Sequence, residues 1–130
     1  MNNLHIITKQ SKYGVKEAVL RLHAELKNRK IPVFAVIDHA RNAGESGLVL
    51  RPTTVVIFGN PAVGTMLMRD ERLMALDLPL RMLVWEDEAG QSWLSYHDIR
   101  EQAREYSLKE NRKIIDAVAG LMTELEKILC

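Results

Sequence analysis

Apolar residues recur at helical spacing near the start of the chain. Val15, Val19, Leu22 and Leu26 are separated by four, three and four residues. This spacing predicts an amphipathic helix that ends near Lys30 and buries one face.

A second apolar stripe runs to the C-terminus. Ser107 and Glu110 have the spacing of a capping box, which predicts that this helix begins at Ser107. The stripe that follows is typical of a helix packed on a core, and its members are Ile114, Val118, Leu121, Leu125 and Ile128.

Between the two stripes, short apolar runs predict strands. The runs at 31–38, 53–58 and 81–87 are apolar at nearly every position, and the turn at 88–91 predicts a hairpin into 92–96. A further strand is expected at 4–8 and a short helix from 98 to about 106. Since a sheet with one wet face should alternate apolar and polar residues, we expect both faces to be covered. The two long helices can cover one face, and the other needs the middle helix, another subunit or a ligand cavity.

The segment after the strand at 53–58 has the glycine spacing of a phosphate-binding loop. However, Thr65 stands where that loop needs lysine, and Pro61 lacks a backbone N–H. These residues therefore argue against a nucleoside triphosphatase. They fit a turn in which Asn60 caps a helix, Pro61 is its first residue and Gly64 lets it approach the sheet. The alternative is a weak anion site at the helix N-terminus, with Arg51 as the counter-charge.

Polar side chains also gather at the predicted strand ends. Asp38-His39, Glu86-Asp87 and Tyr96-His97-Asp98 each follow or end an apolar run. If these ends meet in the fold, the side chains are suited to acid–base catalysis or to a divalent metal. They are equally typical of solvated turns and helix caps, and no local metal-ligand spacing occurs, so no metal site is predicted.

Composition and charge narrow the function. The 130 residues are enough for one domain, the net charge is only +1, and aromatic residues make up 5%. Residues 1–30 carry seven Lys and Arg against two Glu, which is most simply a solvated helix face. The near-neutral net charge and the small share of aromatic residues argue against nucleic-acid binding. Cys130 is the single cysteine and no run of eighteen apolar residues occurs, so we expect a cytoplasmic protein without a membrane span.

Several motifs occur together in a recognisable order. They are IDHARNAGESGLVLRPTTVVIFGNPAVGTMLM, LDLPLRMLVWED and WLSYHD. This series resembles the domain of unknown function 302 family over most of the chain, although Met66 stands where many members have proline. The resemblance implies an α+β fold, with helices packed on a curved, mainly antiparallel sheet in a β-α-β4-α-like order plus an extra middle helix. It also implies a homodimer, since members of this family are often dimeric. It supplies no enzyme activity or cofactor. The residues that fall in the family's motifs are Asp38, His39, Arg51, Asn60, Pro61, Gly64, Glu86 and Tyr96.

These observations support three hypotheses. The first is a small ligand-binding or interaction module, expected to be a homodimer, that takes a small anionic ligand at the Asn60-Pro61 turn with Arg51 and His39 nearby. The second is an enzyme that uses Asp38, His39 and Glu86, although no recognisable catalytic motif is present. The third is a structural homodimer without a ligand. The ligand and any cofactor stay unknown at this level.

Overall fold

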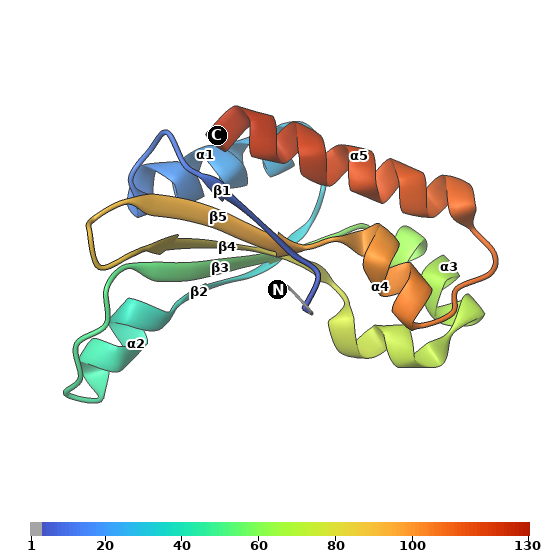
Figure 1. Cartoon of the computed structure of the whole chain (residues 1–130), viewed down its shortest axis with the longest axis horizontal. Coiled ribbons are helices and arrows are strands. Elements are labelled where there is room, and N and C mark those ends of the chain that lie inside the picture. Colours follow the sequence, from blue (N-terminus) through green and yellow to red (C-terminus); the bar gives the residue numbers. More distant parts are fainter. Residues whose placement is uncertain (1–3) are drawn as a thin grey trace.

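The computed structural model of the chain describes residues 4–130 as one antiparallel sheet with helices packed on it (Figure 1). The sheet has five strands in the order β1-β5-β4-β3-β2, and every neighbouring pair is antiparallel. The predicted α+β class and the β-α-β4-α-like order are confirmed. In chain order the elements are β1 (Ile6–Gln10), α1 (Val15–Asn28), β2 (Val33–Asp38), α2 (His39–Glu45), β3 (Thr53–Phe58), α3 (Pro61–Asp70), the 3-10 helix η1 (Arg72–Asp77), β4 (Leu80–Glu86), β5 (Ser92–His97), α4 (Ile99–Glu105) and α5 (Arg112–Leu129).

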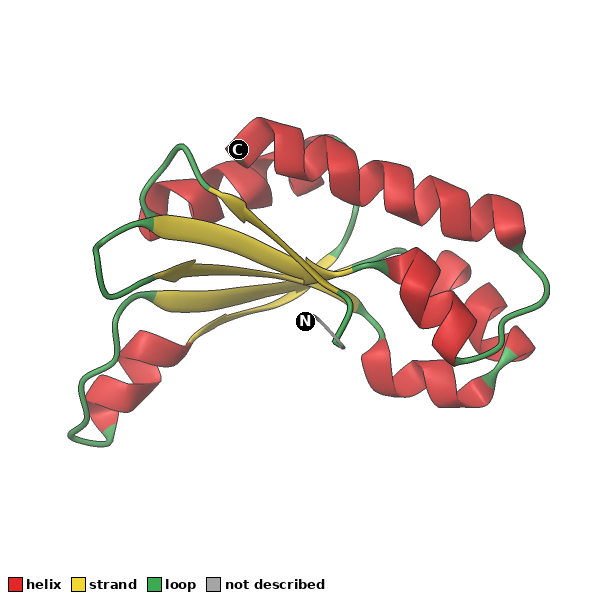
Figure 2. Cartoon of the chain, viewed as in Figure 1, coloured by secondary structure: helices red, strands yellow, loops and turns green. Residues whose placement is uncertain are grey.

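The two long helices, α1 and α5, cover one face of the sheet (Figure 2). Along β3, buried residues alternate with half-buried ones, so Val56 and Phe58 face the helices. Their partners on β4, Met82 and Leu80, lie on the same face. The core is therefore a layer between α1, α5 and one face of the sheet, and burial of this apolar area supplies most of the stabilisation.

The other face of the sheet, here called the second face, is differently covered. Val55, Ile57 and Leu83 project from it by the same alternation and are only half-buried. Within residues 4–130 no helix lies across its centre (Figure 2). We expected both faces of the sheet to be covered. The helices of the chain itself cover only one of them.

A projecting segment follows β2. Residues 39–52, here called the arm, comprise α2 and the loop that leads to β3, and they extend from the sheet on the side opposite α1 and α5 (Figure 1). No residue of α2 is buried. Asp38 caps the start of α2 by accepting the N–H of Arg41 at 2.9 Å.

The start of α5 differs from the capping-box prediction. Ser107 has a φ of 55° and lies outside the helix, which begins at Arg112. Asp70 of α3 holds the segment before the helix, because it accepts the N–H groups of Glu110 at 2.9 Å and Lys109 at 3.5 Å. The N-cap of α5 is Asn111, which has a left-handed backbone and makes no side-chain cap hydrogen bond. The predicted capping box is therefore not the start of this helix.

None of the helices in residues 4–130 is both long and apolar enough to cross a bilayer.

β1 begins two residues later than its apolar run predicted, since Ile6 is its first paired residue and pairs with His97.

The start of α5 can be tested by comparing two alanine variants. Asp70→Ala removes the acceptor for two backbone N–H groups and is expected to lower the free energy of unfolding by about 1 kcal/mol. Ser107→Ala is expected to change it by less than about 0.5 kcal/mol, as for an exposed residue without such a contact. Urea unfolding followed by circular dichroism measures both. A larger loss for Ser107→Ala than for Asp70→Ala would restore the capping box.

Candidate functional site

The eight residues singled out from the sequence do not form one site. Asp38 pairs with Thr54, and Thr53 pairs with Trp85 beside Glu86, so Asp38, His39, Arg51 and Glu86 belong to one end of the sheet. Asn60, Pro61 and Gly64 follow the opposite end of β3. The strand between these two groups is about 20 Å long at 3.3 Å per residue.

Arg51 forms ion pairs with two glutamates at its own end of the sheet. Its Nη1 lies 3.1 Å from Glu86 Oε2, and its Nε lies 3.1 Å from Glu88 Oε2. The hydrogen bonds to Glu88 and then to Glu86 raise the pKa of Arg51 above its usual value. Arg51 therefore does not supply the counter-charge that was expected beside Asn60.

The acidic and histidine residues at that end have ordinary structural contacts. Asp38 caps α2, and His39 is the exposed first residue of that helix. Among residues 4–130, no group of three or more His, Cys, Asp or Glu side chains is arranged to hold a metal ion. The hypothesis of an enzyme built on Asp38, His39 and Glu86 gains no support from this geometry.

Tyr96 lies on the helix-covered face of the sheet and is buried. Its hydroxyl donates to Glu126 Oε1 of α5 at 2.8 Å. Burial, together with this carboxylate, raises the pKa of Tyr96 well above its usual value, so the phenol stays protonated and holds α5 on the sheet.

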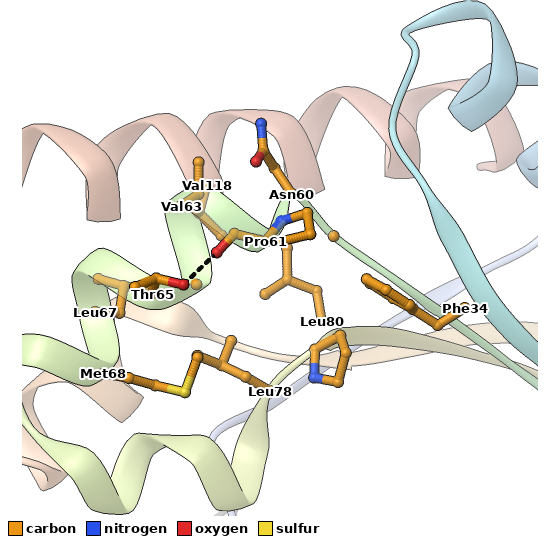
Figure 3. A pocket seen from close by; sticks show the side chains of 13 residues that line it. Phe34, Asn60, Pro61, Val63, Thr65, Leu67, Met68, Leu78, Leu80 and Val118 are labelled. Atoms are coloured by element: carbon orange, nitrogen blue, oxygen red, sulfur yellow. Dashed lines mark hydrogen bonds between the residues drawn. The ribbon is translucent and has the colours of Figure 1, made fainter.

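Three of the sequence-predicted residues do line a cavity. Asn60, Pro61 and Gly64 border a pocket of about 280 Å³ at the start of α3 (Figure 3). Its walls come from β2, α3, the segment between η1 and β4, and α5. The other lining residues are Phe34, Gly59, Val63, Thr65, Leu67, Met68, Leu78, Pro79, Leu80 and Val118.

The local sequence explains how α3 starts at this pocket. Asn60 Oδ1 accepts the N–H of Ala62 at 2.9 Å, and Pro61 is the first helical residue, as predicted. The N–H of Gly64 donates to the carbonyl of Asn60 in the first helical hydrogen bond. Of the four N–H positions that a helix start leaves open, Pro61 has none and that of Ala62 is capped. At most the N–H groups of Asn60 and Val63 are left for an anion.

The lining determines what the pocket can accept. No Lys, Arg, Asp or Glu is among its lining residues. The two polar side chains, Asn60 and Thr65, are both engaged, since Thr65 Oγ1 donates to the carbonyl of Pro61 at 2.7 Å. The pocket therefore suits an apolar group, which burial alone can stabilise.

Gly64 has a different role from the one predicted. A Cβ at this position would lie 3.8 Å from Leu78 Cδ1 and 3.8 Å from Met68 Cε, which is ordinary van der Waals contact. The helix does not need glycine to approach the sheet at this point. Instead, the missing side chain leaves space in the pocket.

Sequence reasoning missed most of the pocket. Phe34 was read only as part of an apolar strand, although its side chain is 52% exposed and forms one wall (Figure 3). Val118 was assigned only to a helical stripe, and Met68 had no predicted role in any site. Nothing in the sequence links these residues, because they come from separate elements that meet only in the fold.

A family model described as "Domain of unknown function DUF302" matches residues 7–129. The chain belongs to this family. A DUF302 protein of known structure, described as an uncharacterized conserved protein from Bacillus stearothermophilus, aligns with a TM-score of 0.75 at 17% identity, covering 97% of this chain and 96% of that chain. At this identity the match shows a common fold.

Two curated relatives are longer proteins. The "Fluoride-specific ion channel FluC 1" of Brucella suis biovar 1 is 44% identical over 103 residues, which cover 79% of this chain and 41% of that protein. The "Fluoride-specific ion channel FluC 2" of Brucella melitensis biotype 1 has the same identity over 103 residues, which are 38% of its length. The chain thus spans about two fifths of the length of the curated relatives it matches.

The space at Gly64 makes a stability prediction. Gly64→Ala adds a methyl group in van der Waals contact and removes a helix-interior glycine, so it is expected to raise the free energy of unfolding by about 1 kcal/mol. Gly120→Ala is a matched control on α5, because a Cβ there meets no atom within 4 Å. Thermal unfolding of both variants separates helix propensity from contact in the pocket. A lower stability for Gly64→Ala than for the wild type would show that the helix does need glycine here.

Proposed function

We propose that this DUF302 domain is a binding module that holds a small, mainly apolar ligand, or the apolar end of a larger one, in the pocket at the start of α3. The observation that carries the proposal is the pocket's lining, with apolar walls from four parts of the chain and no charged side chain. Natural ligand sites are concave and mostly apolar in the same way.

The size of the pocket limits the ligand. A volume of about 280 Å³ holds on the order of ten non-hydrogen atoms, if each occupies about the 30 Å³ of a liquid water molecule. A single substituted ring or a short branched chain fits this volume. A fully charged ligand is disfavoured, since no cationic side chain would offset its loss of hydration. A small anionic ligand, which the sequence suggested, would have at most the N–H groups of Asn60 and Val63 and solvent as partners.

The longer relatives suggest that such a module can be one part of a larger protein. In proteins named fluoride-specific ion channels, a segment similar to this chain makes up about two fifths of the length. This likeness supports the proposal that the domain is part of a larger transport protein and binds a ligand there. We also place the domain in the cytoplasm, because a single cysteine in 130 residues suits a reducing compartment.

The binding proposal is tested by titrating ¹⁵N-labelled protein with toluene and with indole as probes and recording amide shifts by NMR. We expect the largest shifts at Val63, Gly64 and Val118. Gly64→Leu places a side chain in the pocket and is expected to weaken probe binding at least tenfold. Gly120→Leu is the matched control, since Gly120 faces open space, and it should bind as the wild type does.

Two results would contradict the proposal. One is a set of shifts that lies outside the pocket for both probes, and the other is unchanged binding by Gly64→Leu. Sodium fluoride, with sodium chloride as the control for ionic strength, is titrated in the same way. Fluoride-specific shifts in place of probe shifts would replace the apolar ligand by the ion named for the relatives.

A further inference from the structure

One edge of the sheet is open to a further strand. β2 is the last strand in the order β1-β5-β4-β3-β2, and no backbone group in residues 4–130 hydrogen-bonds to its outer side. An edge strand of this kind presents a row of unpaired N–H and C=O groups. The regular part of β2 is 35–38, because its pairing with β3 shifts register between Val33 and Ala35.

The two edges of the sheet differ in their protection against strand addition. The edge strand β1 carries Lys9 at an exposed position, and a charge on an edge opposes the addition of another strand. β2 has the sequence VFAVID, so it contains no proline and no charged residue before Asp38. An apolar edge without such protection is where a partner strand can add.

Apolar side chains beside this edge are also exposed. Phe34 and Val36 are 52% and 45% exposed. Val36 pairs with Val56, which is fully buried on the helix-covered face. The helix layer therefore covers β3 but leaves β2 open on the same side, and the two exposed side chains form an apolar strip along the edge.

The strip is continuous with the pocket at the start of α3. Phe34 belongs to the edge strand and also forms one wall of the pocket (Figure 3). A residue of an added strand that lies beside Phe34 is therefore next to the pocket. In peptide recognition by strand addition, main-chain hydrogen bonds supply affinity and a pocket for a side chain supplies specificity.

The chemistry of the partner follows from these two features. A row of open N–H and C=O groups is complementary to the same groups of an extended polypeptide, which an acyl chain or a free aromatic ring does not carry. Neither the strip nor the pocket has a charged side chain, so the residues recognised are uncharged. The pocket of about 280 Å³ has room for on the order of ten non-hydrogen atoms, which is enough for the side chain of a leucine or a phenylalanine.

We propose that the ligand is an extended, uncharged segment of another protein, which adds to the outer side of β2 and places one large apolar side chain in the pocket. This inference rests on the proposed function, since it names the class of ligand for the same pocket and adds the edge of β2 to the binding surface. An added strand would cover Phe34 and Val36, which the chain itself leaves exposed.

The test is a titration of the ¹⁵N-labelled full chain with the synthetic peptide acetyl-TVTFTVT-amide, in which threonine alternates with apolar residues. We expect amide shifts along 35–38 as well as at the pocket residues Val63 and Gly64. With the peptide in excess, hydrogen exchange is expected to slow at least tenfold at the amides of β2 that do not pair with β3.

Two N-methylated forms of the peptide are the matched controls. Successive amides of a strand point to opposite sides, so methyl groups on alternate amides block the bonds to β2 in one form and face solvent in the other. One form is expected to bind at least tenfold more weakly than the parent peptide, and the other to bind as the parent does. Equal affinity of all three peptides would show that no strand is added.

Two variants place a charge on each edge in turn. Val36→Lys is expected to weaken peptide binding at least tenfold, and to keep the wild-type circular dichroism because the side chain is already exposed. Gln10→Lys lies on β1 beside Lys9 and should bind the peptide as the wild type does. A loss of binding by Gln10→Lys alone would place the added strand on β1 and overturn the proposal.

Indole, titrated into the same labelled protein, separates this proposal from the one on which it rests. Indole binding without peptide binding overturns strand addition and leaves the pocket as a site for a small ligand. Failure of both probes overturns both proposals. Slow exchange along the outer side of β2 before any peptide is added would show that the edge is already covered, and it would also contradict the inference.

Discussion

The unequal covering of the two faces of the sheet is the constraint on which the rest of this structure depends. Five strands expose two broad faces, and α1 and α5 are the only long helices among residues 4–130. Both lie on one face, where burial of Phe58, Met82 and Leu94 excludes water. The short helices lie at the two ends of the sheet. The chain is thus well packed on one side and leaves apolar side chains half-buried on the other.

The same arrangement creates the pocket. α3 leaves the sheet directly after β3, and the segment at Leu78 and Pro79 returns to β4 close to Gly64. Val118 of α5 and Phe34 of β2 complete the walls. Asn60 and Pro61 fix where α3 begins, and their hydrogen bonds leave little for an anion. The pocket and the second face are therefore two separate apolar surfaces.

Much of the fold could be predicted from the sequence, because its signals are local. The stripe from Val15 to Leu26, the hairpin turn before Ser92 and the Asn60-Pro61 helix start each depend on neighbouring residues, and all three are present in the structure. The capping box at Ser107 was wrong, because the helix begins at Arg112 and Asp70 of another element holds the residues just before it. The grouping of Arg51 with Asn60 was wrong because both flank one strand in sequence but lie at its opposite ends. The pocket itself could not be predicted, since its residues meet only after folding.

The central claim is that the chain's own helices cover one face of the sheet and leave the second face open, and the two tryptophans report on this face directly. Trp85 and Trp93 are the only tryptophans of the chain, and both lie half-buried on this face. The measurement is acrylamide quenching of their fluorescence at nanomolar protein concentration, at which weak association is lost. We predict that acrylamide quenches both tryptophans clearly. A quenching constant near zero at this concentration would show that the chain itself covers the face and would contradict the claim.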